Sequence, residues 1–193
     1  IEEEIRHCHK CPLGALRDEK GYMSVPGDGP VPAPVMFIGE APGEEEANQG
    51  KPFVGRAGKL LTQLLVGIGL RREQVYIANI LKCRPPENRT PEDSEARACI
   101  GYLHGQIALV QPKIIALLGA SALKQILGER YQISKQRGKP VQMGGVIFYP
   151  TYHPAAVLHN GSFRTELMLD FQKLRGLLQR VAPELYRTVR TPA

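Results

Sequence analysis

Four cysteines are the side chains of this sequence with the most specific chemistry. Cys8 and Cys11 form a C-x-x-C pair, and Cys83 and Cys99 follow far along the chain. The N-terminal stretch IEEEIRHCHKC is acidic and lacks the apolar core of a signal peptide, so we expect a compartment that disfavours disulfides. An even set of thiols with one C-x-x-C pair then favours a metal site. Four unrelated buried thiols are the alternative.

A cluster of carboxylates occupies the stretch GEAPGEEEANQGKPFVGRAG at residues 39–58. Glu40 stands between Gly39 and Gly43, which let a backbone approach a ligand closely. Phe53 follows in a Gly/Pro-rich loop, where an aromatic ring serves either as a core anchor or as a stacking surface. On the local sequence alone, a solvated acidic turn explains these residues equally well.

Two further polar side chains stand at the ends of apolar runs. Asn79 closes the run YIANI, and His153 begins the stretch HPAAVLHN. Taken singly, each residue is explained as well by a structural role, as a loop cap or as a hydrogen-bonded histidine. The motifs G-x-G-x-x-G, G-x-x-x-x-G-K-S/T and H-E-x-x-H do not occur, so dinucleotide, P-loop and zinc-protease chemistry lack their fingerprints.

Strands must position these side chains, and four short apolar runs predict them. The runs cover residues 35–38, 75–80, 114–118 and 146–149 and are nearly continuous, as in strands buried on both faces. The carboxyl ends of parallel strands meet at one edge of a sheet, where ligands bind in open α/β folds. The sequence therefore predicts that one edge gathers the polar residues at or just past the four runs, Glu40, Asn79, Ser121 and His153.

Helical patterns separate the strands. An apolar stripe over residues 60–68 predicts one helix, and Thr90 as N-cap with Pro91 at the first position predicts a second that runs towards Val110. A short third helix is expected after residue 119 and a fourth over residues 164–181. This alternation predicts a three-layer α/β/α fold with a central four-stranded parallel sheet, and one domain over residues 1–193.

Charge and hydropathy narrow the class of protein. No run of eighteen apolar residues occurs, so no membrane span is expected. The formal net charge of +6 is compatible with a polyanionic partner but is too common to identify one. We expect a cytoplasmic protein.

Taken in order, the motifs resemble a known family. GEAPG, GKPFVGRAG, YIANILKCRPPENR and HPAAVL, together with the four cysteines, closely resemble the family-four uracil-DNA glycosylases of bacteria and archaea. The resemblance runs from about Cys8 to Leu178. It implies the uracil-glycosylase fold, hydrolysis of the N-glycosidic bond of uracil in DNA during base excision repair, and a [4Fe-4S] cluster held by Cys8, Cys11, Cys83 and Cys99. Spacing alone does not exclude zinc, since both metals accept four thiolates.

The resemblance also implies a base pocket. Phe53 would stack on a flipped uracil, and the amide of Asn79 would accept from N3–H and donate to O4. Cytosine presents the reverse pattern and would be rejected. Glu46 would lie near uracil C5 and exclude the methyl group of thymine, and Ala41 and Gly43 would complete the pocket.

Two residues are expected to act on the bond itself. Cleavage makes the sugar cation-like while uracil leaves as an anion. Glu40 would stabilise the cation and position the attacking water, and His153 would donate to the developing oxyanion at O2. One acid of the cluster would therefore face the sugar cation, whereas the basic surface around it faces phosphate.

DNA contacts are expected around this pocket. The basic side chains that would neutralise phosphates are Lys82, Arg84, Lys135 and Arg137. Ser121 would hydrogen-bond a phosphate at a helix start, and Val157 or Leu158 would fill the gap left by the flipped base. The expected partner is uracil-containing DNA, single- or double-stranded, bound by a monomer associated with a prokaryotic nucleoid.

Three alternatives compete with this interpretation. The related branch that traps uracil through a histidine in an inserted loop is disfavoured, because CRPPENRTPEDSEARAC contains no histidine. A non-catalytic iron–sulfur DNA-binding module would share the cysteines and basic residues but would not need the pair Glu40 and His153. A zinc-bearing nucleotide hydrolase would be colourless, whereas an iron–sulfur protein is brown.

Overall fold

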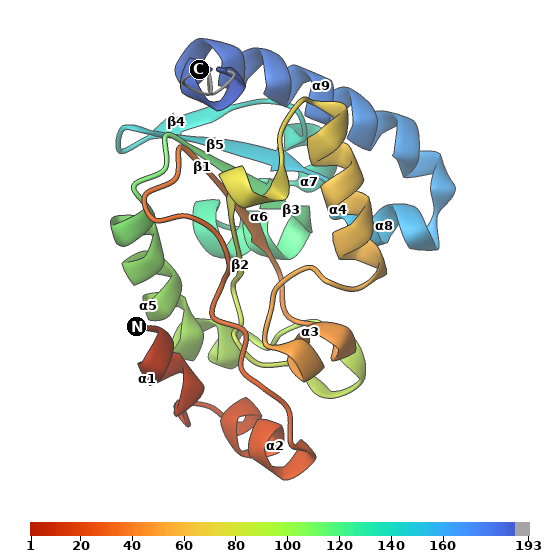
Figure 1. Ribbon diagram of the computed structural model, residues 1–193. Coiled ribbons are helices and arrows are strands. Elements are labelled where there is room, and N and C mark those ends of the chain that lie inside the picture. Colours follow the sequence, from red (N-terminus) through yellow and green to blue (C-terminus); the bar gives the residue numbers. More distant parts are fainter. Residues whose placement is uncertain (188–193) are drawn as a thin grey trace, which may run out of the picture.

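A central sheet with strand order β2-β1-β3-β5-β4 forms the middle of the molecule (Figure 1). The computed structural model describes residues 1–187, so the last part of the predicted domain, 188–193, lies outside the described residues. The first four strands of this order pair in parallel, which confirms the predicted parallel sheet. Their bounds are β1 (Val35–Gly39), β2 (Tyr76–Asn79), β3 (Ile114–Leu118) and β5 (Val146–Thr151).

The sheet has a fifth strand that the sequence analysis missed. Strand β4 (Val141–Met143) pairs antiparallel with β5 at the edge of the sheet. Its turn consists of Gly144 and Gly145, both with positive φ, at 58° and 80°. A two-glycine hairpin turn of this kind is a recognisable sequence signal. The prediction of four strands was wrong because β4 has only three residues, and only Val141 of them is partly buried.

Helices cover both faces of the sheet, which gives the predicted three layers (Figure 1). One core cluster joins a face of the sheet to α4 (Arg56–Gly67), α8 (Pro154–His159) and α9 (Arg164–Val181). The other core cluster joins the opposite face to α5 (Asp93–Val110), α6 (Gly119–Leu127) and α7 (Ile133–Gln136). Within residues 1–187, no helix has the length and apolar character of a membrane span.

Short helices complete the chain. The helices α1 (Glu2–Arg6) and α2 (Pro12–Lys20) precede the sheet, and α3 (Glu44–Gln49) follows β1. Single 3-10 turns cover Arg72–Gln74, Pro86–Asn88, Gly161–Phe163 and Pro183–Tyr186.

The start of α5 differs from the prediction. The helix begins at Asp93 with Glu92 as N-cap, not at Pro91 after Thr90. The Glu95 carboxylate accepts from the backbone N–H of Glu92 at 2.9 Å, and this reciprocal cap determines the first turn. The guanidinium of Arg89 binds both oxygens of Glu95 at 2.7 and 2.9 Å, which holds the loop before α5 away from a helical path.

Candidate active site

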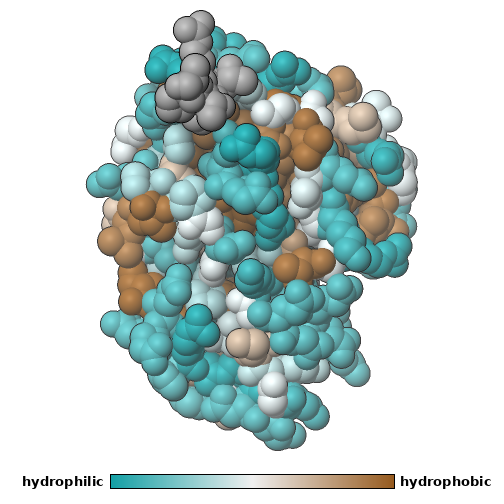
Figure 2. Space-filling model, viewed as in Figure 1, coloured by the Kyte–Doolittle hydropathy of each residue, from teal (hydrophilic) through white to brown (hydrophobic). Residues whose placement is uncertain are grey.

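A cleft of about 800 Å³ lies at the carboxyl edge of the parallel strands. Figure 2 shows the surface hollowed at the right of the view, between the positions of α8 and α3 in Figure 1. The cleft is formed by the turns after β1, β2, β3 and β5 and by the loop before α4. It brings together eight of the residues singled out from the sequence: Glu40, Ala41, Gly43, Glu46, Phe53, Asn79, Ser121 and His153.

The amide of Asn79 lies buried at the wall of this cleft, with only 2% of the residue exposed. Its Oδ1 is buried and has no hydrogen-bond partner in the protein. A Cβ at Gly39 would lie 2.4 Å from this oxygen and 2.6 Å from the Phe53 ring, so only glycine leaves room there. An unpaired buried acceptor costs about 1–3 kcal/mol. A ligand that donates an N–H group would remove this cost.

The loop that carries Phe53 is held in an unusual backbone conformation. Phe53 has a φ of 51°, a region that a non-glycine residue rarely adopts. Arg72 donates to the carbonyl of Phe53 at 2.8 Å and also to that of Pro52. A Cβ at Gly58 would lie 1.9 Å from the Phe53 carbonyl oxygen, so this glycine allows α4 to approach the loop. No local sequence signal pointed to Arg72.

Glu46 supports the same loop from the other side. Its Oε1 accepts from the backbone N–H groups of Val54 and Gly55 at 2.9 and 2.8 Å. Gly55 is the N-cap of α4, where a carboxylate also interacts favourably with the helix dipole. The sequence analysis placed Glu46 against the base alone. The structure adds that its carboxylate orients the two residues that follow Phe53.

His153 is the N-cap of α8, and this position determines its tautomer. Its Nδ1 accepts from the backbone N–H of Ala155 at 3.1 Å. The ring proton therefore lies on Nε2, which makes Nε2 a donor. Burial lowers the pKa of His153 to about 4, although the charge of Glu46 acts in the opposite direction. The residue is thus a neutral donor at neutral pH. Its close packing on Gly119, whose φ is 91°, fixes the turn after β5.

Glu40 lies half-buried in the cleft, at the end of β1. Burial raises its pKa, and the nearby Ser121 hydroxyl acts in the opposite direction. Its backbone carbonyl accepts from the N–H of Leu81 at 3.0 Å, which extends the pairing of β1 with β2 past the strand ends. Ser121 thus lies in the cleft near a carboxylate, and the phosphate contact expected of it stays a prediction.

Two of the predicted phosphate contacts are wrong, because the side chains are committed elsewhere. Lys82 is only 1% exposed, and its Nζ donates to the carbonyl of Asn79 and to Gln106 Oε1, both at 2.7 Å. Arg137 binds both carboxylate oxygens of the buried Asp170, at 2.9 and 3.0 Å. Neither cation is placed to meet a phosphate.

The other residues predicted to contact DNA differ in how exposed they are. Val157 belongs to the core cluster under α8 and is therefore not a wedge, whereas Leu158 is 40% exposed. Lys135 is exposed in α7. Arg84 is partly buried and donates to the Tyr22 hydroxyl at 2.7 Å.

Several cleft residues were not selected as site residues from the sequence. They come from α3, from the start of α4, from the loop before α5 and from the end of α8: Glu44, Glu45, Arg56, Asn88 and His159. Arg89, which the sequence suggested as a basic residue facing phosphate, also lines the cleft. The guanidinium of Arg89 is tied to Glu95, whereas Arg56 is exposed at the first turn of α4.

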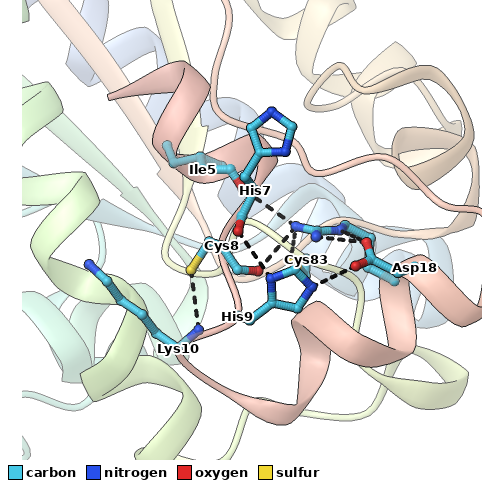
Figure 3. Close-up of polar contacts among 8 residues, drawn as sticks. Ile5, His7, Cys8, His9, Lys10, Asp18 and Cys83 are labelled. Carbon is cyan, nitrogen blue, oxygen red and sulfur yellow. Dashed lines mark hydrogen bonds and ion pairs between the residues drawn. The ribbon is translucent and has the colours of Figure 1, made fainter.

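The four cysteines line one small cavity below the cleft. They come from the N-terminal segment, the loop after β2 and helix α5, and all four thiols are free. The guanidinium of Arg17 approaches this cavity: it donates to the carbonyls of Ile5 and Cys8 at 3.4 and 3.3 Å and lies 4.0 Å from Cys83 Sγ. Nearby, His9 contacts Asp18 at 2.6 Å (Figure 3).

Among residues 1–187, no group of three or more His, Cys, Asp or Glu side chains is placed to hold one metal ion. The thiols surround a cavity rather than converge on a point. In a [4Fe-4S] cluster each of four thiolates binds a different iron, so thiols that surround a cavity fit such a cluster. The donor set itself does not separate the two metals, because zinc also accepts four thiolates.

Comparison with known proteins identifies the family. A model of the Uracil DNA glycosylase superfamily matches residues 26–174. The chain is 47% identical to a Type-4 uracil-DNA glycosylase of Sulfurisphaera tokodaii, across 96% of this chain and 86% of that protein. It is 42% identical to the Type-4 enzyme of Thermotoga maritima, across 93% and 94%. A Type-5 uracil-DNA glycosylase of Pyrobaculum aerophilum is 30% identical, across 92% and 89%. The chain belongs to the type-4 branch of the uracil-DNA glycosylase superfamily.

Proposed function

We propose that this uracil-DNA glycosylase excises uracil by holding the flipped base between Phe53 and Asn79 while His153 and Glu40 act on the glycosidic bond. The observation that carries the proposal is the buried, unpartnered Oδ1 of Asn79. Uracil offers N3–H to this oxygen, and the amide NH₂ of Asn79 donates to O4. Cytosine has an acceptor at N3 and a donor at C4, so both contacts would fail and leave buried polar groups unpaired.

The bond-breaking step follows from the charges of the cleft. His153 is neutral and carries its proton on Nε2, so its N–H can donate to the developing uracil oxyanion. The imidazole does not have to be protonated beforehand. The half-buried Glu40 faces the cation-like sugar and positions the attacking water. The pair explains why the chain needs a carboxylate in a cleft that binds a polyanion.

The four cysteines are proposed to hold a [4Fe-4S] cluster. When bound, such a cluster would tie together the N-terminal segment, the loop after β2 and α5, three parts distant in sequence. It would act structurally, below the cleft.

Iron and acid-labile sulfide analysis tests the cofactor, with about four irons expected per chain. Zinc without sulfide would contradict it. Cys83→Ala should lower soluble yield and DNA affinity together.

The partner is proposed to be uracil-containing DNA, single- or double-stranded, bound by a monomer. Recognition of one flipped base needs only one cleft, and this cleft is built entirely from a single chain. Such an enzyme would act where the chromosome lies, in the cytoplasm of a prokaryotic cell.

The base-reading role is tested with Asn79→Asp. A carboxylate loses the donor to O4, and when protonated it serves the cytosine edge. Oligonucleotides containing uracil or cytosine are incubated with each protein, treated with alkali and examined for strand scission. The parent should cleave only the uracil strand, and the variant should lose part of this preference. An unchanged ratio with full uracil activity would remove Asn79 from the base pocket.

A further inference from the structure

A buried polar network connects the base-reading residue to the cysteine site. Lys82 is its centre: Nζ donates to the backbone carbonyl of Asn79 and to Gln106 Oε1, both at 2.7 Å. The amide of Gln106 in turn donates to the Pro26 carbonyl at 2.7 Å and lies 3.2 Å from the Tyr76 hydroxyl. Lys82 is 1% exposed and Gln106 is 3% exposed, so water does not reach these contacts.

The network spans the segment between the two sites. Asn79 ends β2, and the cysteine at residue 83 follows after three buried residues, Ile80, Leu81 and Lys82. The backbone N–H groups of Ile80 and Leu81 pair with the carbonyls of Gly39 and Glu40, both at 3.0 Å. The side chain of Lys82 therefore hydrogen-bonds back to Asn79, whereas its backbone continues into the loop that carries Cys83.

The same residue contacts the helix that carries another cysteine. Lys82 and Cys99 line the same small cavity as the other three cysteines. Gln106, the side-chain partner of Lys82, lies on α5 seven residues after Cys99, about two helical turns along. Burying a charge costs several kcal/mol unless it is paired and hydrogen-bonded. The presence of a buried lysine at residue 82 therefore points to a function for its side chain.

We infer that Lys82 is a positioning residue for base recognition, which holds Asn79 in register with α5 and with the cysteine loop. The inference rests on the proposed function of the cleft. The lysine touches neither base nor DNA. It acts through the backbone of Asn79, whose amide must meet a uracil edge with little tolerance, since misplacement of a binding group by about 1 Å costs about 100-fold in rate.

The test uses Lys82→Met in the full chain, which keeps an unbranched side chain of nearly the same length and removes its three donors. Lys113→Met is the matched control, since Lys113 is half-exposed and forms a surface pair with Glu184. Single-turnover excision of uracil and amide hydrogen exchange of the peptide covering residues 76–82 are measured on both. Iron content is determined on every preparation.

Lys82→Met should excise uracil about 100-fold more slowly, and its 76–82 peptide should exchange faster because Ile80 and Leu81 lose protection. Lys113→Met should match the parent in both. Parent-like exchange or a parent-like rate in Lys82→Met overturns the inference.

If Lys82→Met fails to fold or loses its iron, the inference is tested with Gln106→Leu, which removes the side-chain partner of Lys82 but keeps Lys82 and every cysteine. The excision rate and the exchange of the 76–82 peptide are measured on this variant in the same way. A parent protein that excises no uracil would contradict the proposed function. The exchange comparison would still test the positioning of Asn79.

Discussion

The ring of Phe53 stacks on the imidazole of His153, with 5.4 Å between the ring centroids and 28° between the ring planes. Phe53 comes from the loop before α4 and His153 from the turn after β5, so the contact closes the cleft from two distant segments. It orients the imidazole beside the surface on which a flipped base is proposed to lie. The proposed base stacking and proton donation would thus depend on one pair of packed side chains.

Removing the Phe53 ring should weaken substrate binding more than it slows the chemical step. Phe53→Ala deletes the stacking surface, which is worth about 1–3 kcal/mol per base, so KM should rise about 5- to 150-fold. Phe163→Ala is the matched control, because Phe163 packs on Tyr152 at 4.7 Å and does not line the cleft. Steady-state kinetics on a uracil oligonucleotide distinguish the two, and an equal rise of KM in both variants would contradict a stacking role.

Filling the space at Gly39 should abolish excision without unfolding the protein. In Gly39→Ala the new Cβ would lie 2.4 Å from Asn79 Oδ1 and 2.6 Å from the Phe53 ring, so one of them must move. Gly67→Ala provides the control, since a Cβ there meets no atom within 4 Å. We expect circular dichroism to show both variants folded and only Gly67→Ala active. A fully active Gly39→Ala would show that the cleft tolerates this displacement.

The pKa of His153 predicts a specific dependence of stability on pH. Burial lowers this pKa from 6.5 to about 4. Between these two values the unfolded chain binds a proton that the folded chain does not, so the free energy of unfolding rises with pH in this window and falls as the pH is lowered. His153→Asn keeps a side chain that can cap α8 but does not titrate. Urea unfolding from pH 4.5 to 7 should therefore show a shallower pH slope for the variant than for the parent. Equal slopes would mean that His153 titrates normally in the folded protein.

Replacing Arg137 should lower the stability of the protein, whereas replacing Lys135 should weaken DNA binding. Arg137→Ala leaves the carboxylate of Asp170 buried and unpaired, which typically costs about 3–5 kcal/mol of unfolding free energy. Lys135→Ala, two residues earlier on the exposed side of α7, should change stability by less than about 0.5 kcal/mol. Its effect should appear in DNA binding, as a weaker salt dependence at every sequence. Urea unfolding and binding titrations at several salt concentrations separate the two, and a stable Arg137→Ala would contradict the structural role.

Local patterns in the sequence determined the strands of the parallel sheet and the convergence of the cleft. Continuous apolar runs identify buried strands without knowledge of their neighbours, and the carboxyl ends of parallel strands necessarily meet at one edge. Glu40, Asn79 and His153 could be placed together for this reason alone. The roles of these residues came from the resemblance of their motifs to a known family, and the chain's membership of that family is confirmed.

Only the tertiary structure decided which charged residues face solvent. Lys82 and Arg137 looked like phosphate contacts, yet their partners Gln106 and Asp170 lie 24 and 33 residues away in sequence. A charged side chain is buried only where folding supplies its partner, because the cost of removing it from water must be offset by contacts. Such partners come from other elements, and the local sequence does not contain them.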